Sequence, residues 1–243
     1  MSFSREIISR DRAGLPAGAG NYLGFNSNTA VIDGQNARFN SIVFNDSSGI
    51  EKPFQDFFGN KLTALPVCFI GAADTLIANV SINGLPAIVA VQANTGGALA
   101  AIIYNFSDHL RDTRSISVIL TFSGTAPTAG RADYFTFYSL RNRQPVSTDS
   151  VTTTIATAQT SNAYLQSALV IAAATNDQAT GNSCTWTSTG VITETNDAAI
   201  GTARCSFAYR GVSTSTVTSG ITSTATWVTP SVAGASLVVA SFM

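Results

Sequence analysis

The chain has 243 residues, of which 45% are hydrophobic and only 11% are charged, less than half of the roughly 25% found in an average soluble protein. This combination excludes an intrinsically disordered chain, which needs low hydrophobicity and high net charge. The balance of 13 Lys and Arg against 14 Asp and Glu argues against a nucleic-acid partner, because binding to phosphates needs clustered cations. The single histidine, His109, excludes a centre built from several histidines.

The residue usage predicts an all-β protein. Thr and Val, which favour strands, are abundant, whereas Glu occurs only at positions 6, 51 and 194 and Lys only at 52 and 61. No apolar run approaches the roughly 20 residues that span a bilayer, so we expect no membrane partner. The first residues lack the basic start and apolar core of a signal peptide, so we expect a protein that is made and kept in the cytoplasm, or released by a route that needs no signal, such as cell lysis.

Residues 1–63 form a segment with its own composition, rich in charge and in loop formers such as the Gly and Pro of residues 14–21. Phe54, Phe57 and Phe58 are spaced to share one face of a short helix, which would act as a docking element. The alternative is an irregular lead-in packed on the following domain. We predict an N-terminal arm or docking segment here.

An internal repeat organises the rest of the chain. Residues 64–74 resemble 168–177, residues 98–104 resemble 203–209, and residues 127–140 resemble 230–243. One offset of about 104 residues across three blocks is not expected from chance similarity of apolar strands. The sequence therefore predicts a duplicated unit, at 64–140 and 168–243, joined by a linker at 141–167 that contains a possible strand at 151–157.

Each unit carries short strands separated by turn signals, which predicts two tandem β-sandwiches of the jelly-roll type. Asn83-Gly84 indicates a tight hairpin turn, since both positions of a type I′ turn need positive φ. Residues 99–104 are apolar almost throughout, as in a strand covered on both faces, whereas residues 115–122 alternate and should expose one face.

No residue pattern indicates catalysis, and we expect no enzyme, no cofactor and no metal site. His109 lies in a polar, charged loop without the Gly-x-Ser-x-Gly turn of a serine hydrolase, and no pair of acids stands out as in a glycosidase. Asp74 and Asp177 occupy equivalent places in the repeat. Calcium ligation is one interpretation, but capping of a turn is the one we favour.

Two tryptophans and three cysteines remain as candidates for contact and covalent sites. Trp186 and Trp227 flank Thr-rich strands and are the aromatic residues that we most expect to be partly exposed, for contact with a glycan or a partner. Cys68, Cys184 and Cys205 are interpreted as buried thiols, with a Cys184–Cys205 disulfide as the alternative.

The second unit resembles a module found in bacteriophage structural and tail-associated proteins. The resemblance is carried by ALVIAAA at 168–174, CTWT at 184–187, ARCSFAYR at 203–210, TATW at 224–227 and AGASLVVASF at 233–242. It implies a lectin-like or jelly-roll β-sandwich and has no catalytic residues to carry over. The first unit departs from it, because residues 64–140 contain no Trp.

We therefore expect a non-enzymatic virion protein that binds copies of itself and neighbouring particle proteins, as decoration, spike, fibre base or tail component. A surface with few charges and many Ser, Thr and Ala side chains suits lateral contacts. Two alternatives stay open at this point: a module that binds a host-surface glycan or receptor, and a capsid subunit made of two jelly rolls.

Overall fold

The computed structural model describes residues 22–23, 28–43, 62–106, 115–137, 144–164, 169–178, 182–188, 193–211, 218–231 and 233–242. All regular elements within these ranges are strands. No helix in this part of the chain is long and apolar enough to span a membrane. The protein is therefore an all-β protein built from antiparallel sheets, as the composition predicts.

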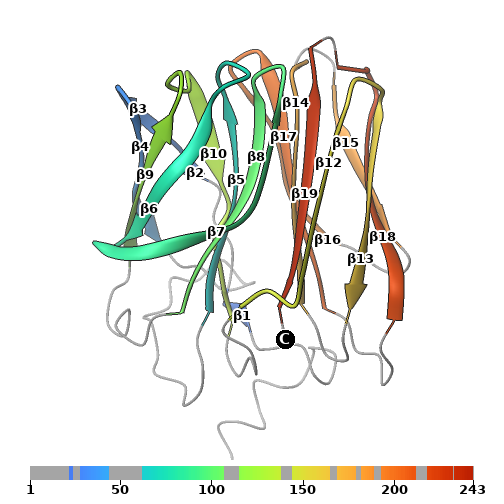
Figure 1. Ribbon diagram of the computed structural model, residues 1–243, viewed down its shortest axis with the longest axis horizontal. Coiled ribbons are helices and arrows are strands. Elements are labelled where there is room, and N and C mark those ends of the chain that lie inside the picture. Colours follow the sequence, from blue (N-terminus) through green and yellow to red (C-terminus); the bar gives the residue numbers. More distant parts are fainter. Residues whose placement is uncertain are drawn as a thin grey trace, which may run out of the picture.

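The strands fall into two β-sandwiches that follow each other along the chain (Figure 1). The first sandwich contains β1 (Tyr22–Leu23), β2 (Asn28–Thr29), β3 (Val31–Asp33), β4 (Asn36–Val43), β5 (Leu62–Ile70), β6 (Leu76–Ile82), β7 (Leu85–Thr95), β8 (Ala98–Phe106), β9 (Ser115–Ser123), β10 (Ala129–Ala132) and β11 (Phe135–Phe137). The second contains β12 (Ser147–Thr153), β13 (Thr157–Tyr164), β14 (Leu169–Asn176), β15 (Cys184–Ser188), β16 (Thr193–Ile200), β17 (Ala203–Gly211), β18 (Thr218–Trp227) and β19 (Ala235–Phe242).

The two sandwiches stand side by side and give four layers of sheet (Figure 1). The inner sheet of the first sandwich runs β1-β11-β5-β8-β7, with β10 and β2 beside β5, and continues through β7 into the outer sheet β6-β9-β4-β3. The inner sheet of the second runs β12-β19-β14-β17-β16, and its outer sheet runs β13-β18-β15. Most of the described turns between strands gather at one end of the molecule, whereas the turn at Asn83-Gly84, between β6 and β7, lies away from that end (Figure 1).

Corresponding strands occupy corresponding places in the two sandwiches. In the inner sheets, β5 lies between β8 and the β10–β11 segment, just as β14 lies between β17 and β19. In the outer sheets, β9 lies between β4 and β6, just as β18 lies between β13 and β15. The three pairs of segments that match in sequence are therefore the three central strands of each inner sheet. This order of strands in two facing sheets is that of a jelly roll.

The inner sheets are apolar on both faces because both faces are covered. Along β8, Leu99 and Ile103 face the core of the first sandwich, whereas Ala100 and Ile102 face the second sandwich, and all four side chains are fully buried. β14 and β19 are likewise buried at every position. The prediction of a strand covered on both faces is confirmed for residues 99–104, and its cause is the contact between the two sandwiches.

The outer sheets alternate because only one face is covered. In β9, Val118, Leu120 and Phe122 are buried while Ile119 points outward, which confirms the expectation for residues 115–122. The hairpin from β6 to β7 is also confirmed: Asn83 and Gly84 have φ of 49° and 78°. Both positive values are those that a type I′ turn requires.

The joint between the sandwiches combines apolar packing with close backbone approach. Many facing side chains are small, so the inner sheets come together across Ala and Cys, and Phe135 packs on Tyr209 with ring centroids 5.7 Å apart. Ser236 Oγ donates to Ala98 O at 2.7 Å across the joint. A Cβ on Gly96 would meet the backbone of Ala233, so only glycine lets these two turns touch.

Two segments differ from the sequence prediction. Residues 28–43, predicted as part of an arm, form β2, β3 and β4, and Ala37 and Phe39 lie fully buried in the first core. Residues 147–164, predicted as linker, form β12 and β13 and complete the second sandwich. In the second segment only the possible strand at 151–157 was expected, because β12 and β13 consist mainly of small polar residues that alternate with few large apolar ones.

Candidate interaction surfaces

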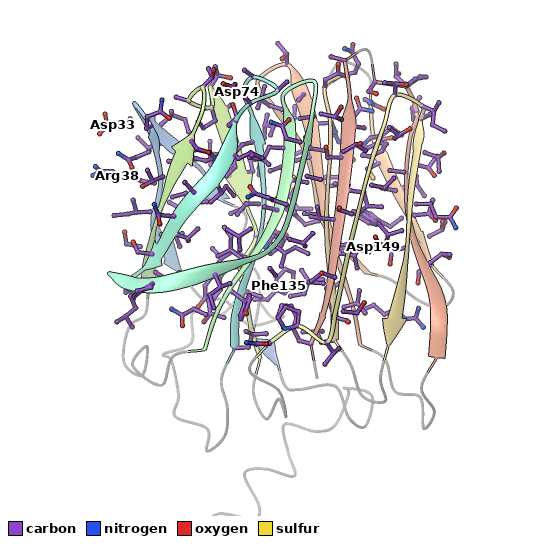
Figure 2. The ribbon with its side chains drawn as sticks, viewed as in Figure 1. Asp33, Arg38, Asp74, Phe135 and Asp149 are labelled. Atoms are coloured by element: carbon purple, nitrogen blue, oxygen red, sulfur yellow. The ribbon has the colours of Figure 1, made fainter. Side chains whose placement is uncertain are left out.

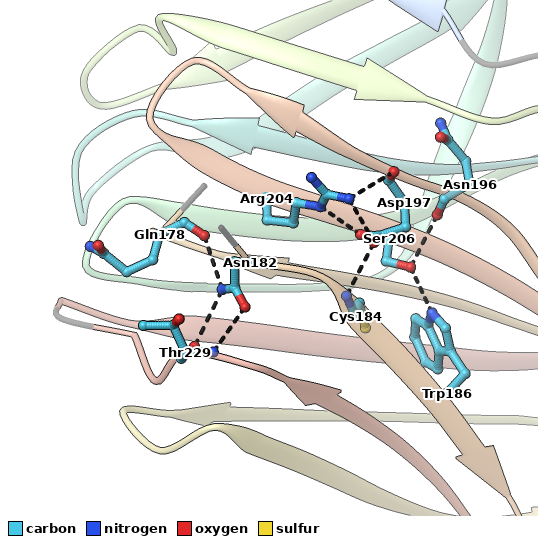
Figure 3. A network of polar contacts seen from close by, with 9 residues as sticks. All are labelled: Gln178, Asn182, Cys184, Trp186, Asn196, Asp197, Arg204, Ser206 and Thr229. Carbon is cyan, nitrogen blue, oxygen red and sulfur yellow. Dashed lines mark hydrogen bonds and ion pairs between the residues drawn. The ribbon is translucent and has the colours of Figure 1, made fainter. Parts of the chain in front are cut away.

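Both tryptophans lie in the core of the second sandwich, which corrects the expectation that they are partly exposed. Trp186 is 9% exposed and Trp227 only 2%. Trp186 Nε1 donates to Ser206 Oγ at 2.7 Å, and Ser206 Oγ donates to Asn196 O at 3.0 Å (Figure 3). Because both rings are enclosed between the two sheets, neither offers a face to a sugar.

The burial of Trp186 follows from its cross-strand neighbours. Trp186 lies opposite Ala225, which lies opposite Ala158, so two small side chains make room for the indole. At the corresponding place in the first sandwich, Val80 lies opposite Leu120. Trp186 beside alanines in the second sandwich therefore takes the place of Val80 beside Leu120 in the first, and the core stays filled in both.

A charged pair joins the two sheets of the second sandwich beside Trp186. Arg204 donates from Nε to Asp197 Oδ1 at 2.8 Å and from Nη2 to Asp197 Oδ2 at 2.7 Å, and Cys184 N donates to Asp197 Oδ2 at 3.2 Å (Figure 3). The side chains are only 20% and 11% exposed, and the hydrogen bond to Asp197 raises the pKa of Arg204. The carboxylate thus connects β17 of the inner sheet to the edge of β15.

Asp74 and Asp177 have the same role in the two sandwiches, and the turn-capping interpretation is confirmed. Asp74 Oδ2 accepts from Thr125 N at 3.1 Å and from Thr125 Oγ1 at 3.2 Å. Asp177 Oδ2 accepts from Ala233 N in the corresponding turn. Each carboxylate of one turn therefore fixes the backbone of the neighbouring turn at the same end of the molecule (Figure 2 labels Asp74).

The three cysteines are free and buried, as expected, and the alternative Cys184–Cys205 disulfide is wrong. Cys184 faces the core of the second sandwich, whereas Cys205 faces the joint, because they lie on opposite sides of the inner sheet. Cys68 approaches Cys205 from the first sandwich, and its thiol lies 3.4 Å from Ala174 O. Burial, together with Cys205, raises the pKa of Cys68 well above its ordinary value.

The remaining candidates lie outside the described residues. Phe54, Phe57 and Phe58 of the predicted docking segment belong to this group, as does His109. Their assignment stays a prediction from the sequence.

The outer face of the second sandwich is an uncharged surface of threonines. Cross-strand pairing places Thr157, Thr226 and Thr185 in one row and Gln159, Thr224 and Thr187 in the next. These side chains are exposed or half-buried. The sequences of β13, β15 and β18 contain no charged residue.

The upper end of this face carries two exposed aliphatic side chains. Ile155 is 63% exposed and Val228 is 71% exposed. The register of β13 and β18, continued by two residues, places them opposite each other, and Trp227 N donates to Ala156 O at 2.8 Å beside them. We call the two threonine rows with Ile155 and Val228 the threonine face.

The outer face of the first sandwich has a different character. Val31, Arg38, Ile119 and Ser81 form a cross-strand row, with Val31 57% and Ile119 37% exposed. Arg38 pairs with Asp33 at 3.6 Å (Figure 2). Apolar and charged side chains therefore mix on this face.

A groove of about 590 Å³ follows the seam between the sandwiches. Ile88 and Tyr104 line it from the first sandwich, and residues 144–148, which begin with Gln144, line it from the second. Ile88 is 55% exposed, and burial raises the pKa of Tyr104. Grooves between packed units are common places for ligands.

Comparison with known proteins adds no relative: no family model, no curated protein and no solved structure matches this chain. Sequence reasoning missed the threonine face. Its signal was present as alternation of Thr in residues 185–187 and 222–226, which marks an outward-facing row once the strands are paired.

Proposed function

We propose that this protein is a non-enzymatic structural subunit of a bacteriophage virion that binds copies of itself and neighbouring particle proteins. The observation that carries the proposal is the threonine face, a surface without charge that ends in exposed Ile155 and Val228. Removing such a surface from water dehydrates no charged group, and its hydroxyls are compensated where the partner supplies hydrogen-bonding groups.

The architecture supports a structural role. The inner sheets pack against each other, the end turns are fixed by Asp74 and Asp177, and Asp197, which pairs with Arg204, connects the two sheets of the second sandwich by accepting from Cys184 N. The corresponding strand orders support duplication of one gene segment. The resemblance of residues 168–243 to phage modules points to the virion, as decoration, spike, fibre base or tail component.

Sedimentation of the purified full chain tests this proposal. We expect assemblies larger than one chain whose population grows with concentration, and we expect electron microscopy of native particles to locate the protein on them. A monodisperse monomer at millimolar concentration would contradict the proposal.

A capsid subunit is the second candidate, favoured by two jelly rolls of the same strand order standing side by side. Such a subunit forms closed shells when it is expressed alone. Negative-stain microscopy of the expressed chain separates the two candidates, because a decoration or tail component forms no shell.

A glycan-binding role is favoured only by the groove at the seam, since the indoles are buried. A glycan array with the wild type and the Gln144→Ala variant tests it. Binding that the variant loses would support this role, and no binding by the wild type would remove it.

A further inference from the structure

We propose that the threonine face binds the same face of a second copy of this chain, giving a two-fold dimer. The inference rests on the proposed function and names the surface through which the subunit assembles. In this dimer the central strand of the face, β18, lies near the symmetry axis with Thr224 and Thr226.

The absence of charge on the threonine face favours a second copy of the same face as its partner. A charged partner surface would lose its hydration against a face that has no charge to offer in return. A threonine hydroxyl both donates and accepts hydrogen bonds, and its methyl group packs on apolar atoms, so the face is complementary to itself. The outer face of the first sandwich is a poorer partner, since it presents Arg38 and Asp33.

The positions of the two exposed aliphatic side chains favour one relative orientation of the two copies. Ile155 and Val228 stand at one end of the face, and they are covered best when the two copies align with their turns at the same end. The molecule already contains this arrangement, because the inner sheets of its two sandwiches pack face to face with their turns at one end (Figure 1).

The size of the face sets the expected affinity. Three strands of about eight residues, with strands ~4.8 Å apart and ~3.3 Å per residue, cover on the order of 400 Å² per copy. This is about half of the ~800 Å² per partner in a standard stable interface. We therefore expect a weak dimer in solution that many copies reinforce on a particle.

Lysine substitutions test the face. Thr224→Lys and Val228→Lys, on β18 and in its continuation, each place like charges opposite each other near the symmetry axis, within the face and at its end. Sedimentation equilibrium from micromolar to millimolar concentration should show self-association weakened about tenfold or more. Ile119→Lys, on the outer face of the first sandwich, is the matched control and should leave it unchanged.

A crosslinking experiment tests the symmetry independently. Thr224→Cys should give a covalent dimer with a short bismaleimide, which adds one thiol at each end, whereas Ile119→Cys should not, since Cys68, Cys184 and Cys205 are buried. Thermal unfolding checks that each variant folds. Self-association that persists in Thr224→Lys and Val228→Lys, or that disappears only in Ile119→Lys, would overturn the threonine face alone. A wild type that never associates would overturn the proposed function as well.

Discussion

The two sandwiches share one strand order, but the interactions that hold the outer sheet to the inner sheet along one side differ between them. In the first, β6 and β7 form a main-chain ladder after the tight turn at Asn83-Gly84. In the second, the described residues of β15 and β16 form no such ladder, and side chains bridge them. Asp197 of β16 accepts from Cys184 N, and Trp186 is linked to Asn196 O of β16 through Ser206 of β17. A fold can therefore be kept while the interactions that close it change from backbone to side chain.

Removing an aromatic ring should have the largest effect and should be similar in both sandwiches. Phe122 lies opposite Ile77 as Trp227 lies opposite Cys184. Each ring is nearly fully buried, so Phe122→Ala and Trp227→Ala should each lower the free energy of unfolding by about 3–5 kcal/mol in urea denaturation.

Trp227→Phe is the matched control, because Trp227 Nε1 has no hydrogen-bond partner among the described residues. It should cost clearly less than the alanine variant. A small loss for Trp227→Ala would show that this ring is not part of the core.

The charged bridge of the second sandwich should depend on both partners. Asp197→Leu leaves the guanidinium of Arg204 without its carboxylate and should cost about 3 kcal/mol in urea denaturation. The double variant Asp197→Leu/Arg204→Leu should recover most of this loss. The aligned residue of the first sandwich is Leu99, which is fully buried. No recovery would contradict the view that an apolar pair substitutes for the charged one.

The contact between sandwiches should tolerate no side chain at Gly96. Gly96 and Gly34 have nearly equal φ, 58° and 55°, but only Gly96 touches the backbone of Ala233. Gly96→Ala should therefore lower the free energy of unfolding by about 1–3 kcal/mol more than Gly34→Ala. Equal losses in the two variants would mean that the joint adapts freely.

Alkaline pH should weaken the joint through Cys68. Burial raises the pKa of this thiol above its ordinary value of 9.0, so only the unfolded chain ionises as the pH rises through 9.0. The stability is fully present below that pH and falls above it, by up to about 1.4 kcal/mol per pH unit. Urea midpoints measured across this range should fall less steeply in Cys68→Ala. An identical slope would exclude this thiol as the cause.

The smallest effect should come from the two turn-capping carboxylates. Asp74→Ala and Asp177→Ala should each cost about 1 kcal/mol, as expected for loss of a hydrogen bond. Thermal unfolding of both variants measures this, and a loss confined to one of them would contradict their common role.

Several features of the fold could be predicted from local sequence because their cause is local. Asn83-Gly84 specifies its own turn, and the alternation in residues 115–122 marks a face. Most of the strand residues in segments 28–43 and 147–164 were not predicted, since these strands pair with partners that are far away in the sequence. Of the candidate contacts, Trp186 and Trp227 were misplaced, because alternation tells which residues share a face but not what covers it.

The sequence by itself determined the all-β class, the segments that would be covered on both faces and the equivalence of Asp74 and Asp177, because composition, hydrophobicity and spacing are properties of the chain. Only the tertiary structure decided that Cys205 meets Cys68 rather than Cys184 and that the threonines form one surface. Both outcomes depend on strand register, which is fixed by contacts between residues far apart in the chain.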